Sequence, residues 1–129
     1  MSTEDQANIK LAIGKESSHF LPMATLSARL AGSEIPTRDP VFGIIANMSM
    51  TGACLITNRG LPEDTLVEVL ISARSLEEDV ALPARIVWCA ERLEPVREIV
   101  GYLTGVTFDT ESESAIQSLL STALFQPVS

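Results

Sequence analysis

The chain has 129 residues, of which 46% are hydrophobic and 20% charged, and this is enough apolar material for one domain with one core. Its net charge of −8 repels the phosphates of nucleic acids and of anionic lipids, which makes nucleic-acid polymers poor candidates for partners. No apolar run approaches the roughly 20 residues that span a bilayer, and residues 1–8 lack the basic and then apolar pattern of a signal peptide. We therefore expect a cytoplasmic protein without membrane insertion.

Residues 1–20 are expected to form an N-terminal arm. The arm can include a short amphipathic helix, because Ser2 or Thr3 can cap the first turn of such a helix. Its apolar residues would be Ile9, Ala12 and Ile13. Over residues 23–30, apolar and polar side chains alternate with the two-residue period of a half-buried strand. Two prolines within residues 32–40 then predict a loop.

Short runs rich in Ile, Val and Leu predict further strands, separated by turn-rich loops. These runs cover residues 42–48, 53–57, 66–72, 84–90 and 100–108. Gly52 lies in the turn between the first two runs, and we expect it to take a positive φ that other residues avoid. Ile86 and Trp88 share one parity along their strand, so both side chains are expected inside the fold.

The last element changes to the period of a helix. Residues 111–125 carry apolar side chains three and four positions apart, Thr110 and Glu113 form a capping box, and Pro127 ends the helix. About six short strands and one helix predict an all-β fold with a terminal helix, namely a six-stranded antiparallel β-barrel capped by a C-terminal α-helix. A β-sandwich is the rival topology. The domain is expected to span residues 21–126, with residues 127–129 as a tail.

The reactive groups of the chain argue against an enzyme. The single histidine, His19, falls in a predicted loop, and the chain has neither a G-x-S-x-G nucleophile motif nor a glycine-rich phosphate loop. The acidic residues 77–79 are expected to form a solvated hairpin tip rather than a cation site. Cys54 and Cys89 lie far apart in apolar stretches, which favours buried reduced thiols over a disulfide or a zinc site. We expect no catalytic residue, no metal and no cofactor.

One hexapeptide, Asn47-Met48-Ser49-Met50-Thr51-Gly52, resembles the N-x-S-x-x-G signature of PilZ domains, a bacterial family of cyclic di-GMP receptors. Later stretches resemble the family in the same order. They are Ala53-Cys54-Leu55-Ile56, residues 61–69, Pro83-Ala84-Arg85-Ile86-Val87-Trp88 and Gly105-Val106-Thr107-Phe108. The resemblance covers roughly residues 23–124, and its barrel agrees with the one predicted from periodicity.

The resemblance implies that Asn47, Ser49 and Gly52 hold a guanine and the phosphodiester ring of cyclic di-GMP on the outer face of the barrel. An amide and a hydroxyl can hydrogen-bond the polar edges of such a ligand, and a glycine lets the backbone come close. Turn chemistry explains the same three residues equally well, because Asn and Ser side chains bond neighbouring backbone groups. The sequence leaves both interpretations open.

The chain departs from the family where cyclic di-GMP-binding members carry an R-x-x-x-R signature that grips the phosphates. The corresponding stretch, residues 20–25, contains no arginine. Lys15 and Arg29 are candidates for auxiliary contacts, and Arg38 is a further nearby cation, but none has the spacing of that pair. Each lost charged hydrogen bond is worth about 1.5 to 3 kcal/mol, so binding should weaken by roughly two to four decades.

The sequence therefore supports two functions. The first is a PilZ-like signalling adaptor that binds the dinucleotide weakly or not at all and acts on an unknown protein partner. Its contact surface would be formed by Met48 and Met50, by the N-terminal segment or by the last helix. The alternative is a true cyclic di-GMP receptor that uses the N-x-S-x-x-G turn. An interaction barrel outside the family is the interpretation left if the hexapeptide match is accidental.

Overall fold

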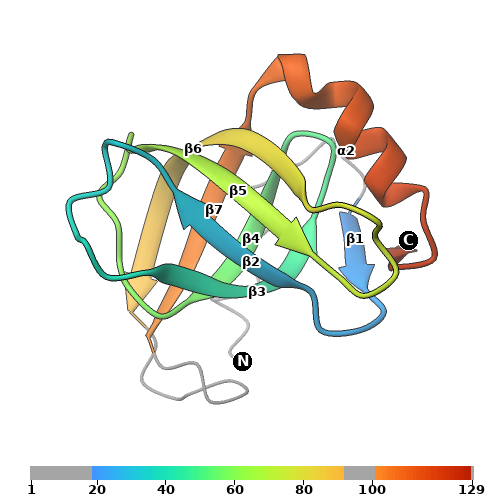
Figure 1. The fold of residues 1–129 in the computed structure, drawn as a ribbon, viewed down its shortest axis with the longest axis horizontal. Coiled ribbons are helices and arrows are strands. Elements are labelled where there is room, and N and C mark those ends of the chain that lie inside the picture. Colours follow the sequence, from blue (N-terminus) through green and yellow to red (C-terminus); the bar gives the residue numbers. More distant parts are fainter. Residues whose placement is uncertain (1–18, 92–100, 129) are drawn as a thin grey trace.

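The computed structural model describes residues 19–91 and 101–128 of the chain. Most of these residues form antiparallel strands, and a short helix follows the seventh strand (Figure 1). In chain order the elements are β1 His19–Pro22, β2 Ser27–Ala31, β3 Val41–Met48, β4 Gly52–Thr57, β5 Leu66–Ser72, β6 Val80–Glu91, β7 Tyr102–Phe108, the 3₁₀ helix η1 Thr110–Ser112, α2 Glu113–Leu120 and β8 Phe125–Val128.

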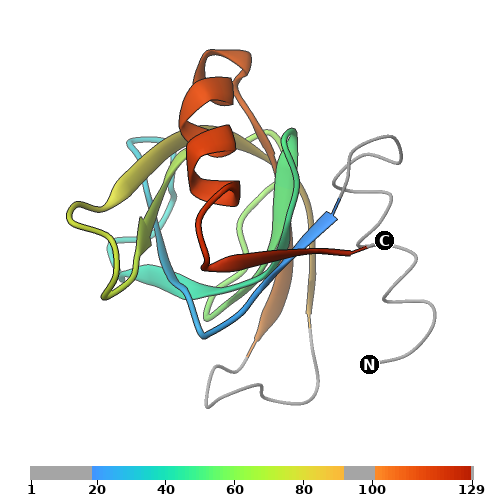
Figure 2. The same cartoon turned by 90° about the vertical axis from the view of Figure 1, so that its right-hand side faces the viewer.

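Six of the strands close into a barrel. Their order is β2-β5-β6-β7-β4-β3, and β3 pairs back onto β2, so every strand of the ring has two antiparallel neighbours. Closure removes the exposed edges that an open sheet of this size would present. The predicted six-stranded antiparallel barrel with a C-terminal helix is thereby confirmed. The remaining strands, β1 and β8, pair with each other to form a ribbon that continues the sheet beyond β3 (Figure 2).

The core fills the barrel with alternate side chains from every strand, as the two-residue period of a strand requires. Fully buried members include Leu55, Ile71, Leu82, Ile86 and Val106. The apolar stripe of α2 adds Ile116, Leu119 and Leu120 to the same cluster. The helix thus packs on the barrel through the face that its apolar spacing predicts.

The C-terminal helix is shorter than the sequence predicts. The expected helix over 111–125 begins with the 3₁₀ turn η1, for which Asp109 and not Thr110 is the N-cap, and α2 ends at Leu120. The Thr122 hydroxyl donates to the carbonyl oxygen of Leu119 at 2.7 Å, and the chain then enters β8. Pairing with β1 gives the backbone of residues 125–128 its hydrogen-bond partners, which outweighs the local helical pattern.

The β1–β8 ribbon was not predicted. His19, expected in a loop, pairs with Val128, and Pro22 pairs with Phe125 at the other end of the ribbon. Both expected boundaries of the domain, at residues 21 and 126, fall inside these two strands. The expected arm helix and the candidate auxiliary residue Lys15 both lie outside the described residues. Within the part of the chain that the structure describes, no helix is long and apolar enough to cross a membrane.

Candidate functional site

The hexapeptide forms the tight connection between β3 and β4. The Ser49 amide donates to the Gly52 carbonyl oxygen at 2.8 Å, and the Ser49 hydroxyl oxygen accepts from the amides of Thr51 and Gly52 at 3.2 Å each. Ser49 has no exposed surface. Its hydroxyl therefore already serves the turn that Ser49 begins, which is the structural role that turn chemistry predicts.

Gly52 is required at this turn for its size and not for its backbone angle. The expected positive φ is wrong, because Gly52 is not among the residues with positive φ. A Cβ at this position would instead lie 2.4 Å from the carbonyl oxygen of Val106 on β7. The glycine thus lets β4 approach β7 closely where the barrel strand starts, and any side chain there would separate the two strands.

Asn47 lies near the end of β3, after a break in the β3–β4 register between Ile45 and Asn47, and pairs with Cys54. Its Oδ1 atom is buried and has no hydrogen-bond partner. A buried carbonyl oxygen without a partner costs about 1 to 3 kcal/mol. The Asn47 carbonyl oxygen therefore has no hydrogen-bond partner among the described residues, whereas the Ser49 hydroxyl already has its partners within the turn.

Trp88 lies in the same cross-strand row as Asn47, on the outside of the barrel. The row runs through Asn47 on β3, Cys54 on β4, Gly105 on β7 and Trp88 on β6. A Cβ on Gly105 would meet Nε1 of Trp88 at 2.3 Å and Cε2 at 2.5 Å, so the indole covers this glycine. The Trp88 Nε1 atom is buried and also lacks a hydrogen-bond partner. The row thus contains one unpaired donor and one unpaired acceptor.

The expected position of Trp88 inside the barrel is wrong. Ile86 is fully buried in the main core, but the β6–β7 register shifts between Ile86 and Trp88. One extra residue reverses which side of the strand the next side chain faces. Trp88 accordingly packs on a second apolar cluster, whose buried members are Cys54, Ile56 and Leu103. This cluster lies on the outer face, so β4 is buried on both sides.

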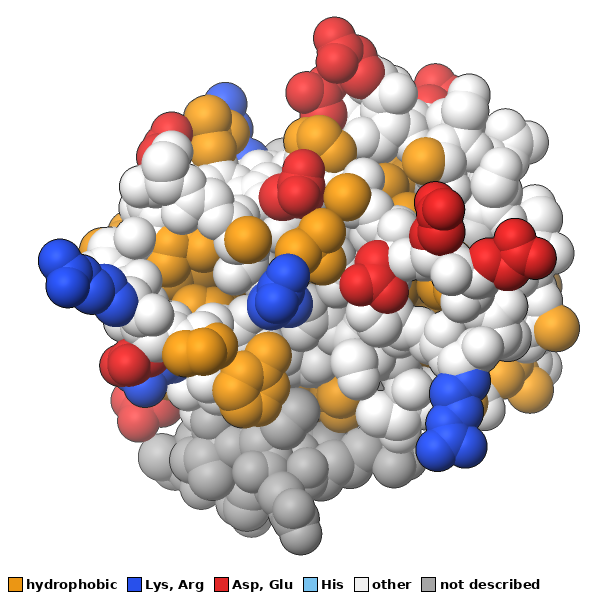
Figure 3. Space-filling view, in the orientation of Figure 1, with side chains coloured by type: hydrophobic (Ala, Val, Ile, Leu, Met, Phe, Trp, Pro, Cys, Tyr) orange, Lys and Arg blue, Asp and Glu red, His pale blue; other side chains and the backbone are white. Residues whose placement is uncertain are grey.

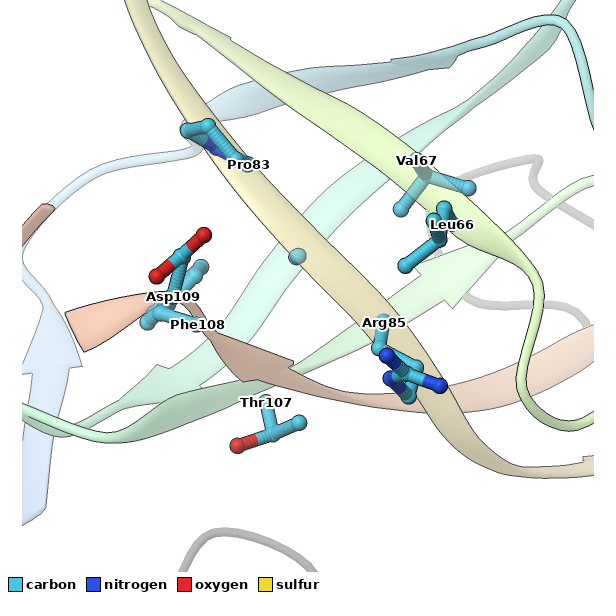
Figure 4. A pocket seen from close by; sticks show the side chains of 8 residues that line it. Leu66, Val67, Pro83, Arg85, Thr107, Phe108 and Asp109 are labelled. Carbon is cyan, nitrogen blue, oxygen red and sulfur yellow. The ribbon is translucent and has the colours of Figure 1, made fainter. Parts of the chain in front are cut away.

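A second row next to the turn contains an arginine that the sequence analysis did not select. Arg85 on β6 pairs with Thr107 on β7, which pairs with Gly52 on β4. The Thr107 hydroxyl donates to the Thr51 carbonyl oxygen at 3.2 Å. Arg85 is exposed and lines a groove of about 410 Å³ together with Leu66, Thr107 and Asp109 (Figure 4). A cation and a carboxylate therefore share the groove beside the turn.

The cations that the sequence analysis did select are not brought to the turn. Arg29 pairs with Phe42, five residues before Asn47 along β3, which corresponds to roughly 16 Å at about 3.3 Å per residue. Arg38 is exposed in the loop before β3. Leu21 is closer: Phe20 pairs with Met48, so the antiparallel register places Leu21 beside Asn47. Its side chain is 47% exposed, and it lies within residues 20–25, the stretch that the resemblance sets against the arginine signature.

Comparisons with known proteins agree with this architecture. A comparison with curated proteins found no match. A solved structure titled "Structure of Bacillus subtilis Inhibitor of motility (MotI/DgrA)" is similar in fold, with a TM-score of 0.53 and 11% sequence identity. The similarity covers 81% of this chain and 47% of that one, so the chain spans about half the length of its structural neighbour.

The comparison with protein families identifies the chain by sequence. Residues 20–126 match the PilZ domain, from the first strand of the ribbon to the last. The match includes the N-x-S-x-x-G turn, the barrel and α2, the three features on which the resemblance depends. Because this match extends over most of the 129 residues, the chain belongs to the PilZ domain family.

Proposed function

We propose that this PilZ domain is a cytoplasmic, non-catalytic adaptor in cyclic di-GMP signalling that acts through protein contacts and binds the dinucleotide weakly or not at all. The observation that carries the proposal is the residue beside Asn47. Leu21 occupies that position, and no arginine occurs in residues 20–25. A leucine offers neither the charge nor the planar fork with which a guanidinium holds a phosphate.

The turn itself adds a second argument for weak binding. The Ser49 hydroxyl oxygen accepts hydrogen bonds from two backbone amides, and the residue has no exposed surface. A ligand would therefore have to compete with the turn for this group. Two missing charged contacts, each worth about 1.5 to 3 kcal/mol, lower affinity by roughly two to four decades. Arg85 is a single exposed guanidinium that shares its groove with Asp109, so it compensates for only part of this loss.

The protein contact is proposed at the groove between α2 and the β1–β8 ribbon. Met48 is fully buried, so of the two methionines expected to form the contact surface, Met50 alone can contribute to it. Met50 is half-buried and lines a groove of about 730 Å³ that also includes Gln117 of α2 and Phe20 of β1. A flexible thioether beside an amphipathic helix suits a protein partner. Pull-down with wild type and with Met50→Asp would identify that partner and test the groove together.

A specific observation favours the alternative, a true cyclic di-GMP receptor. The unpaired Asn47 Oδ1 acceptor and the unpaired Trp88 Nε1 donor lie in one row beside the turn. The edge of a guanine carries both donors and acceptors and could satisfy both atoms. In this alternative, the free energy recovered by pairing two buried groups compensates for part of the missing phosphate contacts.

Calorimetric titration with cyclic di-GMP tests the proposal. We expect no saturable binding by the wild type at low micromolar concentrations, and binding at least 100-fold tighter by Leu21→Arg/Thr25→Arg. Both positions are exposed, so the double variant should fold normally. Leu21→Lys/Thr25→Lys is the matched control, because it adds equal charge without the fork and should gain less. Tight binding by the wild type that is lost in Asn47→Ala would establish the receptor instead.

A further inference from the structure

The groove between α2 and the β1–β8 ribbon has an apolar floor and a polar wall. Figure 2 shows α2 next to this ribbon. The floor is lined by four large apolar side chains, which are Phe20, Met50, Leu120 and Phe125. The wall is a stripe of three exposed residues four positions apart along α2 and its C-cap, namely Glu113, Gln117 and Ser121. A groove of this kind can receive an amphipathic segment of a partner protein.

The elements that form this groove carry acidic charges and no lysine or arginine. Residues 101–128 contain three carboxylates and no basic side chain, and residues 19–22 contain no lysine or arginine. The carboxylate of Glu113 lines the groove itself. Figure 3, in the orientation of Figure 1, shows acidic but no basic side chains around α2 at the upper right. Charge complementarity therefore favours a segment that carries lysine or arginine beside its apolar residues.

The free edge of the ribbon disfavours a partner that adds a further strand. β8 is the last strand of the described sheet. The Met23 amide donates to the Leu124 carbonyl oxygen at 2.7 Å, so the alternation of an antiparallel ladder turns the backbone groups of Phe125 and Pro127 outwards. Proline has no N–H, and the Phe125 N–H donates to the Thr122 carbonyl oxygen at 3.4 Å. An added strand would find carbonyl oxygens at this edge but no free N–H, which makes a helix the better occupant.

We propose that the groove receives a helix of the partner protein that has an apolar stripe flanked by lysine or arginine. This inference rests on the adaptor function proposed above and specifies the chemistry of its partner. The apolar stripe covers Phe20 and Met50, and a basic side chain meets the carboxylate of Glu113. The eight residues of α2 form about 12 Å of helix, so a partner helix of about three turns spans the groove.

Three synthetic peptides of about 14 residues, roughly 21 Å of helix, test the proposal. The first has leucines at helical spacing with lysines beside them, the second has glutamates in place of the lysines, and the third is the lysine peptide with prolines at its centre. Fluorescence anisotropy at physiological salt should show saturable binding of the lysine peptide, about tenfold tighter than that of either other peptide. The NMR shifts that this peptide changes should centre on Phe20, Met50 and Gln117.

Variants of the domain separate the groove from a general attraction between opposite charges. Glu113→Lys and Gln117→Lys should each weaken binding of the lysine peptide about fivefold, because each puts a like charge beside it. Glu68→Lys is the matched control: it makes the same change of charge as Glu113→Lys at an exposed residue of β5, outside the groove, and should leave affinity within about twofold. Met50→Asp adds a negative charge, so attraction by charge alone would tighten binding, whereas loss of the apolar contact should weaken it. Thermal melts verify that each variant is folded.

Several results would overturn the proposal. They are the absence of saturable binding by the lysine peptide, equal binding of the lysine and glutamate peptides, and equal losses in Glu113→Lys and Glu68→Lys. Undiminished binding of the proline peptide would refute the helix. A pulled-down partner that requires Met50 but is displaced only by the glutamate peptide would refute this partner chemistry and leave the adaptor function intact. Failure of the adaptor function is recognised separately, by tight binding of cyclic di-GMP to the wild type.

Discussion

Gly105→Ala is the substitution that best tests the position of Trp88. The new Cβ would lie 2.3, 2.5 and 2.9 Å from three atoms of the indole ring, whereas ordinary contacts begin near 3.4 Å. The ring would have to retreat by about 1 Å from the glycine that it now covers. Packing errors of this size cost about 1 to 3 kcal/mol of unfolding free energy.

The expected loss can be expressed as a melting temperature. With an unfolding entropy of about 2.1 cal/mol/K per residue, a chain of 129 residues loses about 4 °C for each kcal/mol. Gly105→Ala should therefore lower Tm by roughly 4 to 11 °C. Trp88 is the sole tryptophan of the chain, so its fluorescence reports the displacement directly. We expect emission at longer wavelength and stronger quenching by acrylamide than in the wild type.

A double-mutant cycle with Trp88→Ala identifies the cause. The three atoms nearest to the added Cβ all belong to Trp88, so removing the indole removes the clash. Gly105→Ala should then become neutral or stabilise the Trp88→Ala protein by about 0.5 to 1 kcal/mol, because alanine is favoured over glycine in a strand. An equal loss of stability in both backgrounds would show that the backbone, and not the indole, rejects a side chain at position 105.

Two further substitutions test the site, and a third tests a contact between the barrel strands β4 and β7, all by thermal or chemical denaturation. Ser49→Ala removes the acceptor of two turn amides and should cost about 1 to 3 kcal/mol; no loss would show that the hydroxyl is not needed by the turn. Asn47→Leu replaces an unpaired buried acceptor by an apolar group of similar size, so the free energy of unfolding should be unchanged or higher. A clear loss of stability would show that Oδ1 has a partner. Thr104→Val breaks the buried 2.9 Å contact between the Thr104 and Thr57 hydroxyls and should cost about 1 kcal/mol, whereas an unchanged Tm would contradict that contact.

The alternation of apolar and polar side chains along single strands predicted the barrel well, because every second side chain of a barrel strand packs in the core. It failed for Trp88 because a β-bulge inserts one residue, and no local feature of the run from Ala84 to Ala90 marks that insertion. The φ of Gly52 was mispredicted for a related reason. A glycine can serve a turn or a close approach between strands, and only the position of Val106 on a distant strand decides between them.

The ribbon could not be predicted because its two strands are distant in sequence. Each has four residues and contains a proline, which are weak signals for a strand. Residues near Phe125 continue the helical spacing of α2, so local periodicity favours a longer helix there. The candidate site was also predicted only in part, because some of its residues are distant in sequence. The turn was found from its hexapeptide, but the neighbours Leu21 and Arg85 come from strands whose register only the fold determines.

The pairing of His19 with Val128 has a mechanical consequence. The described chain enters and leaves the domain at the same end of one antiparallel ribbon. A force applied through both ends would therefore unzip β1 from β8 one pair at a time, beginning at His19, while the closed ring of six strands bears no load. Phe20 of that ribbon pairs with Met48, next to Asn47. Tension between the flanking segments would therefore pull β1 away from the candidate site before the barrel unfolds.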